Sequence, residues 1–221
     1  MENKLLDPIA ILKSKEEHAR EELAGDAPLL ALSFPGGIFL YTLTPSAAHQ
    51  KIVLLSANPG ACIFLAGRGK QSDLVILKNE IRQWVNAYEQ FVHGKDIAGR
   101  IVAPTATAIL RRHYLESPKA LAVQLVIADP LDPEYPFCSI SFAGDQFVAK
   151  NFILQDSHIY TVEQQFRSLD EAKAFAKKSL RPRRGLFVQK HAFLTNPKKK
   201  VKNSPPPPEP NPPAGEEINQ Q

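Results

Sequence analysis

The chain has 221 residues, of which 43% are hydrophobic, and a formal net charge of +4. This is enough for one well-filled domain, and no apolar run is long enough to cross a bilayer. The opening segment MENKLLD is polar and does not resemble a signal peptide, so we expect a cytoplasmic protein without a membrane partner. Two cysteines cannot form a disulfide framework, and Cys62 reads as a buried free thiol.

The positive charge is concentrated near the C-terminus. A lysine cluster there precedes a proline-rich segment, and its members are Lys198, Lys199, Lys200 and Lys202. Local charge of this kind, without an aromatic-basic motif, argues against a nucleic-acid partner. We expect residues 197–221 to be a disordered, partly polyproline tail, more typical of a solvated spacer than of a ligand for an SH3-like domain.

The first element is predicted to be a helix. Asp7-Pro8 is typical of a helix start, with an N-cap acceptor followed by proline at the first helical position. The helix is predicted to end at about Leu23, before Gly25. Residues 1–24 therefore form an N-terminal segment and helix ahead of the main domain, which we place at 25–196.

Two apolar strand pairs follow. The four predicted strands are Leu29–Phe34, Ile38–Tyr41, Ile52–Leu55 and Cys62–Leu65. Their turns are Pro35-Gly36-Gly37 and Asn58-Pro59-Gly60, where proline presets φ and glycine supplies a positive φ. Strands that are apolar on both faces are typical of the middle of a layered sandwich.

Beyond Gly67 the apolar period becomes helical. We expect helices over Ser72–Val92 and Asp96–Leu115, with Pro104 either kinking the second helix or marking the start of its regular part. The strands predicted after them are Leu121–Ala128, Phe137–Ala143 and Gln146–Leu154.

The last elements are a helix and a short strand. The capping box Ser168-Leu169-Asp170-Glu171 predicts a helix that ends at about Leu180, and Gly185–Lys190 is a candidate final strand. The whole order predicts an α+β fold, in which two sheets lie between helix pairs as a four-layer αββα sandwich.

Sandwiches of this kind often begin their first strand with a threonine, serine or cysteine freed by self-cleavage, whose amine then activates the side chain. Here that position falls near Ala27-Pro28. Alanine offers no nucleophile, and a full helix precedes it, so this position argues against catalysis.

Other catalytic and cofactor motifs are absent from the sequence. The segment Gly67-Arg68-Gly69-Lys70 is too short for a phosphate-binding loop, and Ser33 lies in a strand without a nucleophile elbow. The six histidines do not have metal-ligand spacing; they are His18, His49, His93, His113, His158 and His191. We expect no catalytic residue, no metal and no cofactor.

Lys51, at the start of the second strand pair, has two interpretations of equal weight. It can be a strand-entry lysine whose ammonium reaches solvent. Alternatively its stem is buried and its ammonium meets a carboxylate, from a partner's side chain or from a chain terminus.

Several segments have the order and spacing of one family. Glu17-His18-Ala19-Arg20-Glu21 resembles E-Y-A-R-E, Pro45–Ile52 matches N-P-S-x-x-x-Q-K-I, and Asp96-Ile97-Ala98-Gly99-Arg100 is similar to D-V-T-G-R. Further matching segments are Leu30–Leu40, Ala66-Gly67, Val123–Ala128, Ser141–Asp145 and Arg181-Pro182-Arg183-Arg184. From about Ile9 to Leu180 the chain resembles α-type subunits of the 20S proteasome, and more particularly the bacterial kind found in actinobacteria.

This resemblance implies a non-catalytic subunit with the N-terminal-nucleophile (Ntn) hydrolase fold. Seven copies would form an outer ring stacked on proteolytic β-type subunits, and unfolded substrates, including ones tagged by a small protein modifier, would pass through. The N-terminal segment would gate the entrance, and its residues are Met1, Glu2, Asn3, Lys4, Leu5 and Leu6. A pocket between neighbouring subunits, with Lys51, Glu17 and Gly67 at the matching positions, would hold the C-terminal tail of an AAA+ ring ATPase.

The chain also departs from that family. The stretch from Gln155 to Ser168 is too short for the family's third long helix, the strand after the last helix is predicted to be missing or cut down, and His18 replaces a tyrosine. Two alternatives therefore stay open: a stand-alone proteasome-like hydrolase that matures by losing its first helix, and a degenerate homologue that acts as an interaction module.

Overall fold

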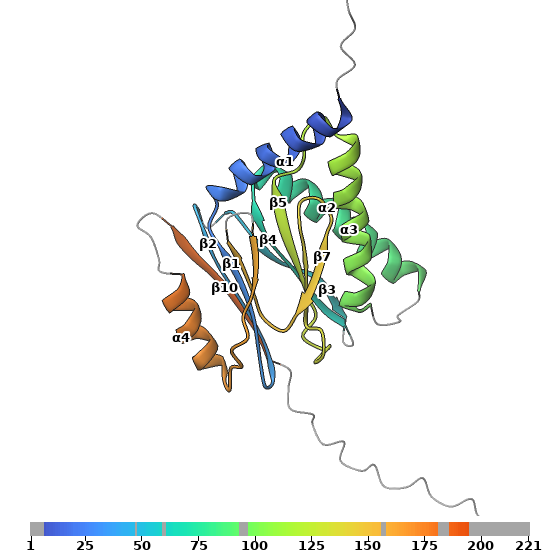
Figure 1. Cartoon of the computed structure of the whole chain (residues 1–221). Coiled ribbons are helices and arrows are strands. Elements are labelled where there is room, and N and C mark those ends of the chain that lie inside the picture. The colour runs from blue at the N-terminus through green and yellow to red at the C-terminus, as the bar shows by residue number, and fades with distance from the viewer. Residues whose placement is uncertain are drawn as a thin grey trace, which may run out of the picture.

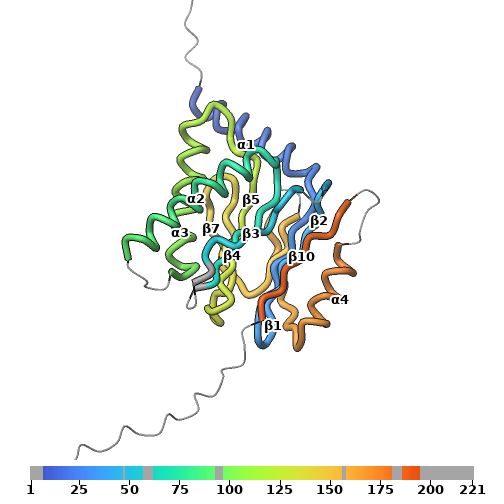
Figure 2. The backbone as a smooth tube through the Cα atoms, turned by 180° about the vertical axis from the view of Figure 1, so that it is seen from behind, coloured from blue at the N-terminus to red at the C-terminus, as the bar shows by residue number. Residues whose placement is uncertain are grey.

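The computed structural model describes residues 7–46, 48–58, 61–92, 97–155, 158–180 and 186–194. Within these ranges the chain folds into helices and two antiparallel sheets (Figures 1 and 2). The helices are α1 (Pro8–Ala24), α2 (Gln71–Phe91), α3 (Gly99–Glu116) and α4 (Leu169–Ser179).

The first sheet, called sheet 1, has the strand order β10-β2-β1-β8-β9. Its strands are β1 (Leu29–Phe34), β2 (Gly37–Thr44), β8 (Phe152–Gln155), β9 (His158–Thr161) and β10 (Phe187–Leu194). The β1–β2 hairpin turns at Gly36, whose φ of 93° is the left-handed conformation that glycine adopts without cost.

The second sheet, called sheet 2, has the order β3-β4-β5-β6-β7. Its strands are β3 (Ile52–Asn58), β4 (Ala61–Gly69), β5 (Val123–Ala128), β6 (Phe137–Ile140) and β7 (Gln146–Ala149). β5 is buried along its whole length, as expected of a central strand packed on both faces.

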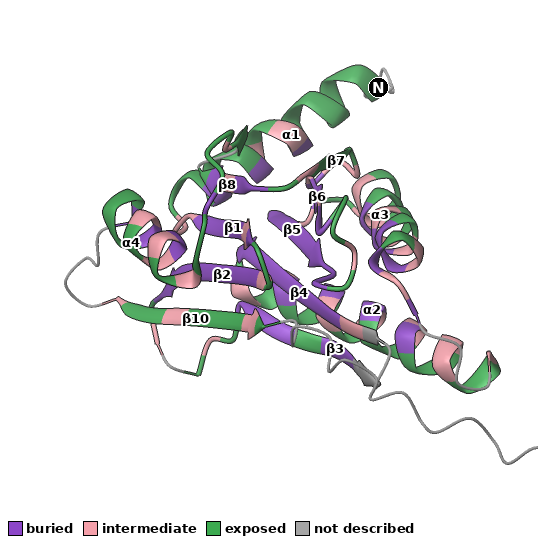
Figure 3. Cartoon of the chain, turned by 90° about the horizontal axis from the view of Figure 1, so that it is seen from below, coloured by how far each residue is buried: buried purple, intermediate pink, exposed green. Residues whose placement is uncertain are grey.

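The two sheets pack against each other through one apolar layer. Residues that alternate along the strands supply it, namely Leu29, Ala31, Ile38 and Leu40 from sheet 1 with Phe64, Ala66, Val126 and Ala128 from sheet 2. Figure 3 shows these strands as mostly buried, with the edge strand β10 largely exposed.

Helices cover the outer faces of both sheets. Leu74, Leu77, Ile81 and Val85 repeat along one face of α2 and pack, together with α3, on sheet 2. On sheet 1, Ala172 and Ala176 of α4 contact Leu30 and Leu32. The fold is therefore α+β, with two antiparallel sheets.

The sequence predicts helix pairs outside the two sheets. For sheet 1 this prediction is wrong within the described residues, where α4 alone packs on the outer face. The stretch that would supply another helix forms β9 instead, and the chain then runs without regular structure to the N-cap Ser168. This stretch is too short for a long helix, as its sequence suggested.

α1 lies across one end of the two sheets (Figure 1). Ala19 and Leu23 are buried against Ala122 and Phe142. Lys15 is also buried, and its Nζ donates to the carbonyl oxygens of Tyr114 (2.9 Å) and Leu115 (3.2 Å) near the end of α3. A cation at a helix C-terminus satisfies carbonyls that have no partner within the helix.

Most predicted boundaries agree with the structure within a few residues, but two predictions near the C-terminus are wrong. The single strand predicted over Gln146–Leu154 is two strands that belong to different sheets, β7 in sheet 2 and β8 in sheet 1. The final strand is not cut down, because all eight residues of β10 pair with β2, from Phe187↔Thr44 to Leu194↔Gly37.

The helix α3 settles the question of Pro104. α3 begins at Gly99, five residues before Pro104, and continues beyond it to Glu116. Its regular part therefore does not begin at the proline. No helix within the described ranges has the length and hydropathy needed to cross a bilayer.

Several predicted features lie outside the described residues. They are the gate segment Met1–Leu6, the turn residues Pro59-Gly60, Asp96 at the start of the second long helix, Arg181-Pro182-Arg183-Arg184 and the tail 197–221. The domain limits 1–24, 25–196 and 197–221 stay predictions.

Candidate functional site

Lys51 lies immediately before β3, at the end of the sheets that α1 covers. Its side chain is only 2% exposed. Its backbone N–H donates to Oε1 of Gln189 on β10 (2.8 Å), and its carbonyl accepts from the N–H of Gly67 on β4 (2.9 Å). Both sheets therefore fix the backbone of Lys51, and its side chain has little freedom.

The ammonium of Lys51 binds Asp26, which follows α1. Nζ lies 2.6 Å from Oδ1 and 2.7 Å from Oδ2 of Asp26. Burial lowers the pKa of Lys51 from its usual value, while the charge and hydrogen bonds of Asp26 act in the opposite direction. The buried-stem interpretation of Lys51 is thus correct, but the carboxylate belongs to the same chain.

Two further contacts fix Asp26. Its Oδ2 accepts the N–H of Gly69 (2.6 Å), and its carbonyl accepts Nη2 of Arg68 (3.0 Å). Arg68 is fully buried, and it also donates to the carbonyl of Leu23 at the end of α1 and to Oε1 of Gln124 (3.3 Å). Arg68 and Lys51 therefore fasten the α1–β1 connection to the end of β4.

A hollow of about 250 Å³, called the Lys51 hollow, opens beside this ion pair. It is lined by Glu22, Gly25, Asp26, Pro45, His49, Lys51, Gly69, Lys70 and Gln71. Of the three predicted docking residues, only Lys51 lines it. Glu17 lies on the exposed side of α1, and Gly67 lies within β4, where an added Cβ would be 2.4 Å from Leu74.

The head of β1 lies next to the same ion pair. Ala27 and Pro28 directly follow Asp26, and the carbonyl of Pro28 accepts the hydroxyl of Thr42 (2.9 Å). Ala27, at the position compared with a nucleophile on sequence grounds, thus lies two residues after the C-cap Gly25 of α1.

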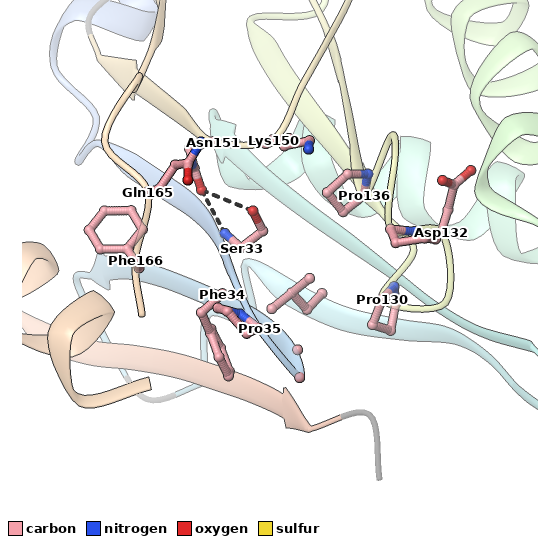
Figure 4. Close-up of a pocket in the computed structure, with 14 residues that line it drawn as sticks. Ser33, Phe34, Pro35, Pro130, Asp132, Pro136, Lys150, Asn151, Gln165 and Phe166 are labelled. Atoms are coloured by element: carbon pink, nitrogen blue, oxygen red, sulfur yellow. Dashed lines mark hydrogen bonds between the residues drawn. The ribbon is translucent and has the colours of Figure 1, made fainter. Parts of the chain in front are cut away.

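A second hollow, of about 350 Å³, lies at the opposite end of the sheets, near the β1–β2 turn (Figure 4). Asn151 makes several hydrogen bonds at this hollow. Its Oδ1 accepts the backbone N–H of Ser33 (2.6 Å), and its Nδ2 donates to the carbonyls of Val162 and Gln164. These bonds tie β1 to the chain around β8 and β9. The amide of Asn151 is therefore a structural tie and not a free ligand group.

Replacement of Asn151 with leucine is expected to lower the free energy of unfolding by about 2–3 kcal/mol. The change removes the side-chain partner of two half-buried backbone groups, the N–H of Ser33 and the carbonyl of Val162. Urea denaturation followed by circular dichroism measures the loss. The neighbouring Lys150→Ala, at an exposed position, should change stability by less than about 0.5 kcal/mol, and an equal loss in both variants would contradict the structural role of Asn151.

The thiols are not activated for chemistry. Burial raises the pKa of Cys138 to about 11, and burial together with the Asp129 carboxylate raises the pKa of Cys62. In the part of the chain that the structure describes, no three His, Cys, Asp or Glu side chains gather in a way that could hold a metal ion.

Comparison with known proteins gives a distant similarity to one kind of subunit. No protein-family model matches the chain. The chain is similar to proteins named "Proteasome subunit alpha" from Mycobacterium ulcerans (strain Agy99) and Mycobacterium marinum (strain ATCC BAA-535 / M). Each is 26% identical over 124 residues, which are 56% of this chain and 45% of the relative. The similarity therefore spans about half the length of each relative.

Proposed function

We propose that this chain is a non-catalytic, proteasome-related subunit of the α type. The observation that carries the proposal is the head of β1, where Ala27 stands in place of a nucleophile and the ion pair of Asp26 with Lys51 fastens the preceding helix. The distant similarity to proteasome α subunits is independent support.

The fold supports the finer part of this proposal. Two antiparallel sheets pack face to face, α2 and α3 lie outside sheet 2, and α4 lies outside sheet 1. We infer that this is the four-layer αββα sandwich of the Ntn hydrolases, with its outer layer on sheet 1 reduced to a single helix in the described residues.

The partners follow from the same proposal. The chain would form a ring with further copies of itself, stack on a β-type subunit, and pass unfolded, modifier-tagged substrates through an entrance gated by Met1–Leu6 in the cytoplasm. An AAA+ ring ATPase would dock beside Lys51, Glu17 and Gly67. The Lys51 hollow supports a docking site near Lys51.

Co-expression with a β-type subunit from the same genome tests the proposal. We expect a high-mass barrel in native mass spectrometry, with peptidase activity that disappears when the β-type nucleophile is replaced. The chain alone should show no peptidase activity.

Intact mass provides the control. The stand-alone hydrolase alternative requires the loss of α1, so a stable chain that keeps residues 7–24 excludes that maturation. Recovery of only a monomer or a dimer after co-expression would contradict the proposed assembly, and would favour the interaction-module alternative if the chain also binds no ATPase.

A further inference from the structure

We propose that Asp26 is an internal competitor for the partner carboxylate that Lys51 would receive. In this chain the ion pair between Asp26 and Lys51, called the latch, occupies the docking lysine. The Lys51 hollow therefore accepts a C-terminal carboxylate only when the charge of Asp26 is neutralised or displaced. This inference rests on the proposed function, which assigns Lys51 to docking.

The first step is that the carboxylate of Asp26 already binds the ammonium of Lys51. Both carboxylate oxygens of Asp26 lie within 2.7 Å of Nζ, and the Lys51 side chain is 2% exposed. A second carboxylate that approaches Nζ would lie beside the first one, where two like charges repel each other strongly in a partly desolvated site.

The second step is that Asp26 is the more exposed member of the ion pair. Asp26 is 19% exposed, more than Lys51, and both residues line the hollow. An arriving carboxylate therefore approaches the charge of Asp26 as well as that of Lys51, and Glu22 adds a second negative charge to the lining. The exposed Lys70 at the rim is the remaining lysine of the lining.

The third step is that the latch does not open freely. Oδ2 of Asp26 also accepts the N–H of Gly69, and the Asp26 carbonyl is held by the fully buried Arg68. Displacement of the Asp26 side chain would break its bonds to Lys51 and to Gly69. Asparagine at position 26 keeps one oxygen for the N–H of Gly69 and removes the competing charge, so Asp26→Asn separates the electrostatic effect from the structural one.

The test measures peptide binding to full-length variants. The probes are synthetic peptides that copy the last eight residues of each AAA+ ring ATPase encoded in the same genome, each with a C-terminally amidated twin. With isothermal titration calorimetry we expect Asp26→Asn to bind at least one carboxylate peptide about tenfold more tightly than the unmodified chain does. The amidated twin should show no gain.

Two matched variants provide controls. Glu22→Gln removes an acidic group that lines the same hollow without contacting Lys51 in the described structure, and it should change affinity by less than about threefold. Addition of Lys51→Met to Asp26→Asn should abolish the gain, because the gained contact is with Nζ. Thermal melts recorded beforehand establish that each variant is folded at the temperature of the titration.

Three results would overturn the latch: equal binding by Asp26→Asn and the unmodified chain, no binding by either, or an equal gain for the amidated twin. Barrel formation by the unmodified chain with the β-type subunit reports separately on the proposed function. A barrel without a binding gain for Asp26→Asn refutes only the latch, whereas an unmodified chain that forms no barrel refutes the proposed assembly.

Discussion

Alanine at position 69 is expected to lower the free energy of unfolding by about 4 kcal/mol or more, or to prevent folding. Gly69 has a φ of 118°, in the left-handed region that other residues adopt only under strain. An added Cβ would lie 2.0 Å from the carbonyl oxygen of Ala122 and 2.9 Å from Cα of Val123. Both atoms belong to the backbone, so no side chain can rotate away to relieve the clash.

The effect of Gly69→Ala should extend to the α1–β1 connection. The N–H of Gly69 donates to Asp26, and the N–H of Lys70 donates to Ala122. A displaced β4 end would therefore also loosen the Asp26–Lys51 pair. Urea denaturation followed by circular dichroism measures the total loss, and hydrogen exchange at the C-terminal end of α1 measures the local one.

Gly36→Ala is the matched control for Gly69→Ala. Gly36 has a similar φ of 93°, but an added Cβ there has no heavy atom within 4 Å. Its cost is the backbone conformation alone, about 1–2 kcal/mol. If both alanine variants lose the same stability, the close approach of β4 and β5 at Gly69 is not what restricts this position.

The sequence was most informative where its apolar period is unbroken. The continuous apolar run Leu29–Phe34 identifies a strand that is buried on both faces, and the helical period along α2 identifies a helix and its buried face. The N-caps Asp7 and Ser168 could also be predicted from the sequence. In the structure their side chains accept the backbone N–H groups of Ile9 and Glu171. These signals are local in the chain.

Sheet membership could not be predicted from local signals. β7 and β8 are separated only by Lys150 and Asn151, and both strands continue the same apolar pattern. Tertiary contacts separate β7 from β8. The buried side-chain amide of Asn151 forms hydrogen bonds with β1 and with the chain after β9. Asn151 is a polar residue in an apolar run, and this was the available signal in the sequence. It does not indicate to which sheet the segments before and after it belong.

The candidate site was only half predictable. Lys51 was identified, but its partner Asp26 lies 25 residues away, and the two residues are brought close by the packing of two different sheets, because Asp26 precedes β1 and Lys51 precedes β3. The role of Arg68 had a signal that was missed. It follows Phe64 and Ala66 at alternate positions of β4, on the face turned to the other sheet, where a cation is buried and must find acceptors.

Lys51→Met is expected to lower the free energy of unfolding by about 3 kcal/mol, because it leaves the Asp26 carboxylate beside a buried apolar side chain. Asp26→Asn should cost about 2 kcal/mol, since Lys51 then loses its charged partner while the N–H of Gly69 keeps an acceptor. The double variant removes both charges, so its loss should fall short of the sum of the single losses by about 1.5 kcal/mol or more.

The same cycle on an exposed pair shows whether burial is the cause. Lys173 and Asp170 of α4 are 3.1 Å apart, with side chains 38% and 90% exposed, so Lys173→Met with Asp170→Asn should couple by less than about 0.5 kcal/mol. Urea unfolding at 25 °C measures both cycles. Equal coupling in the two pairs would mean that the Asp26–Lys51 bond is no stronger than a solvated one, and Arg68 would then be the stronger tie between the α1–β1 connection and β4.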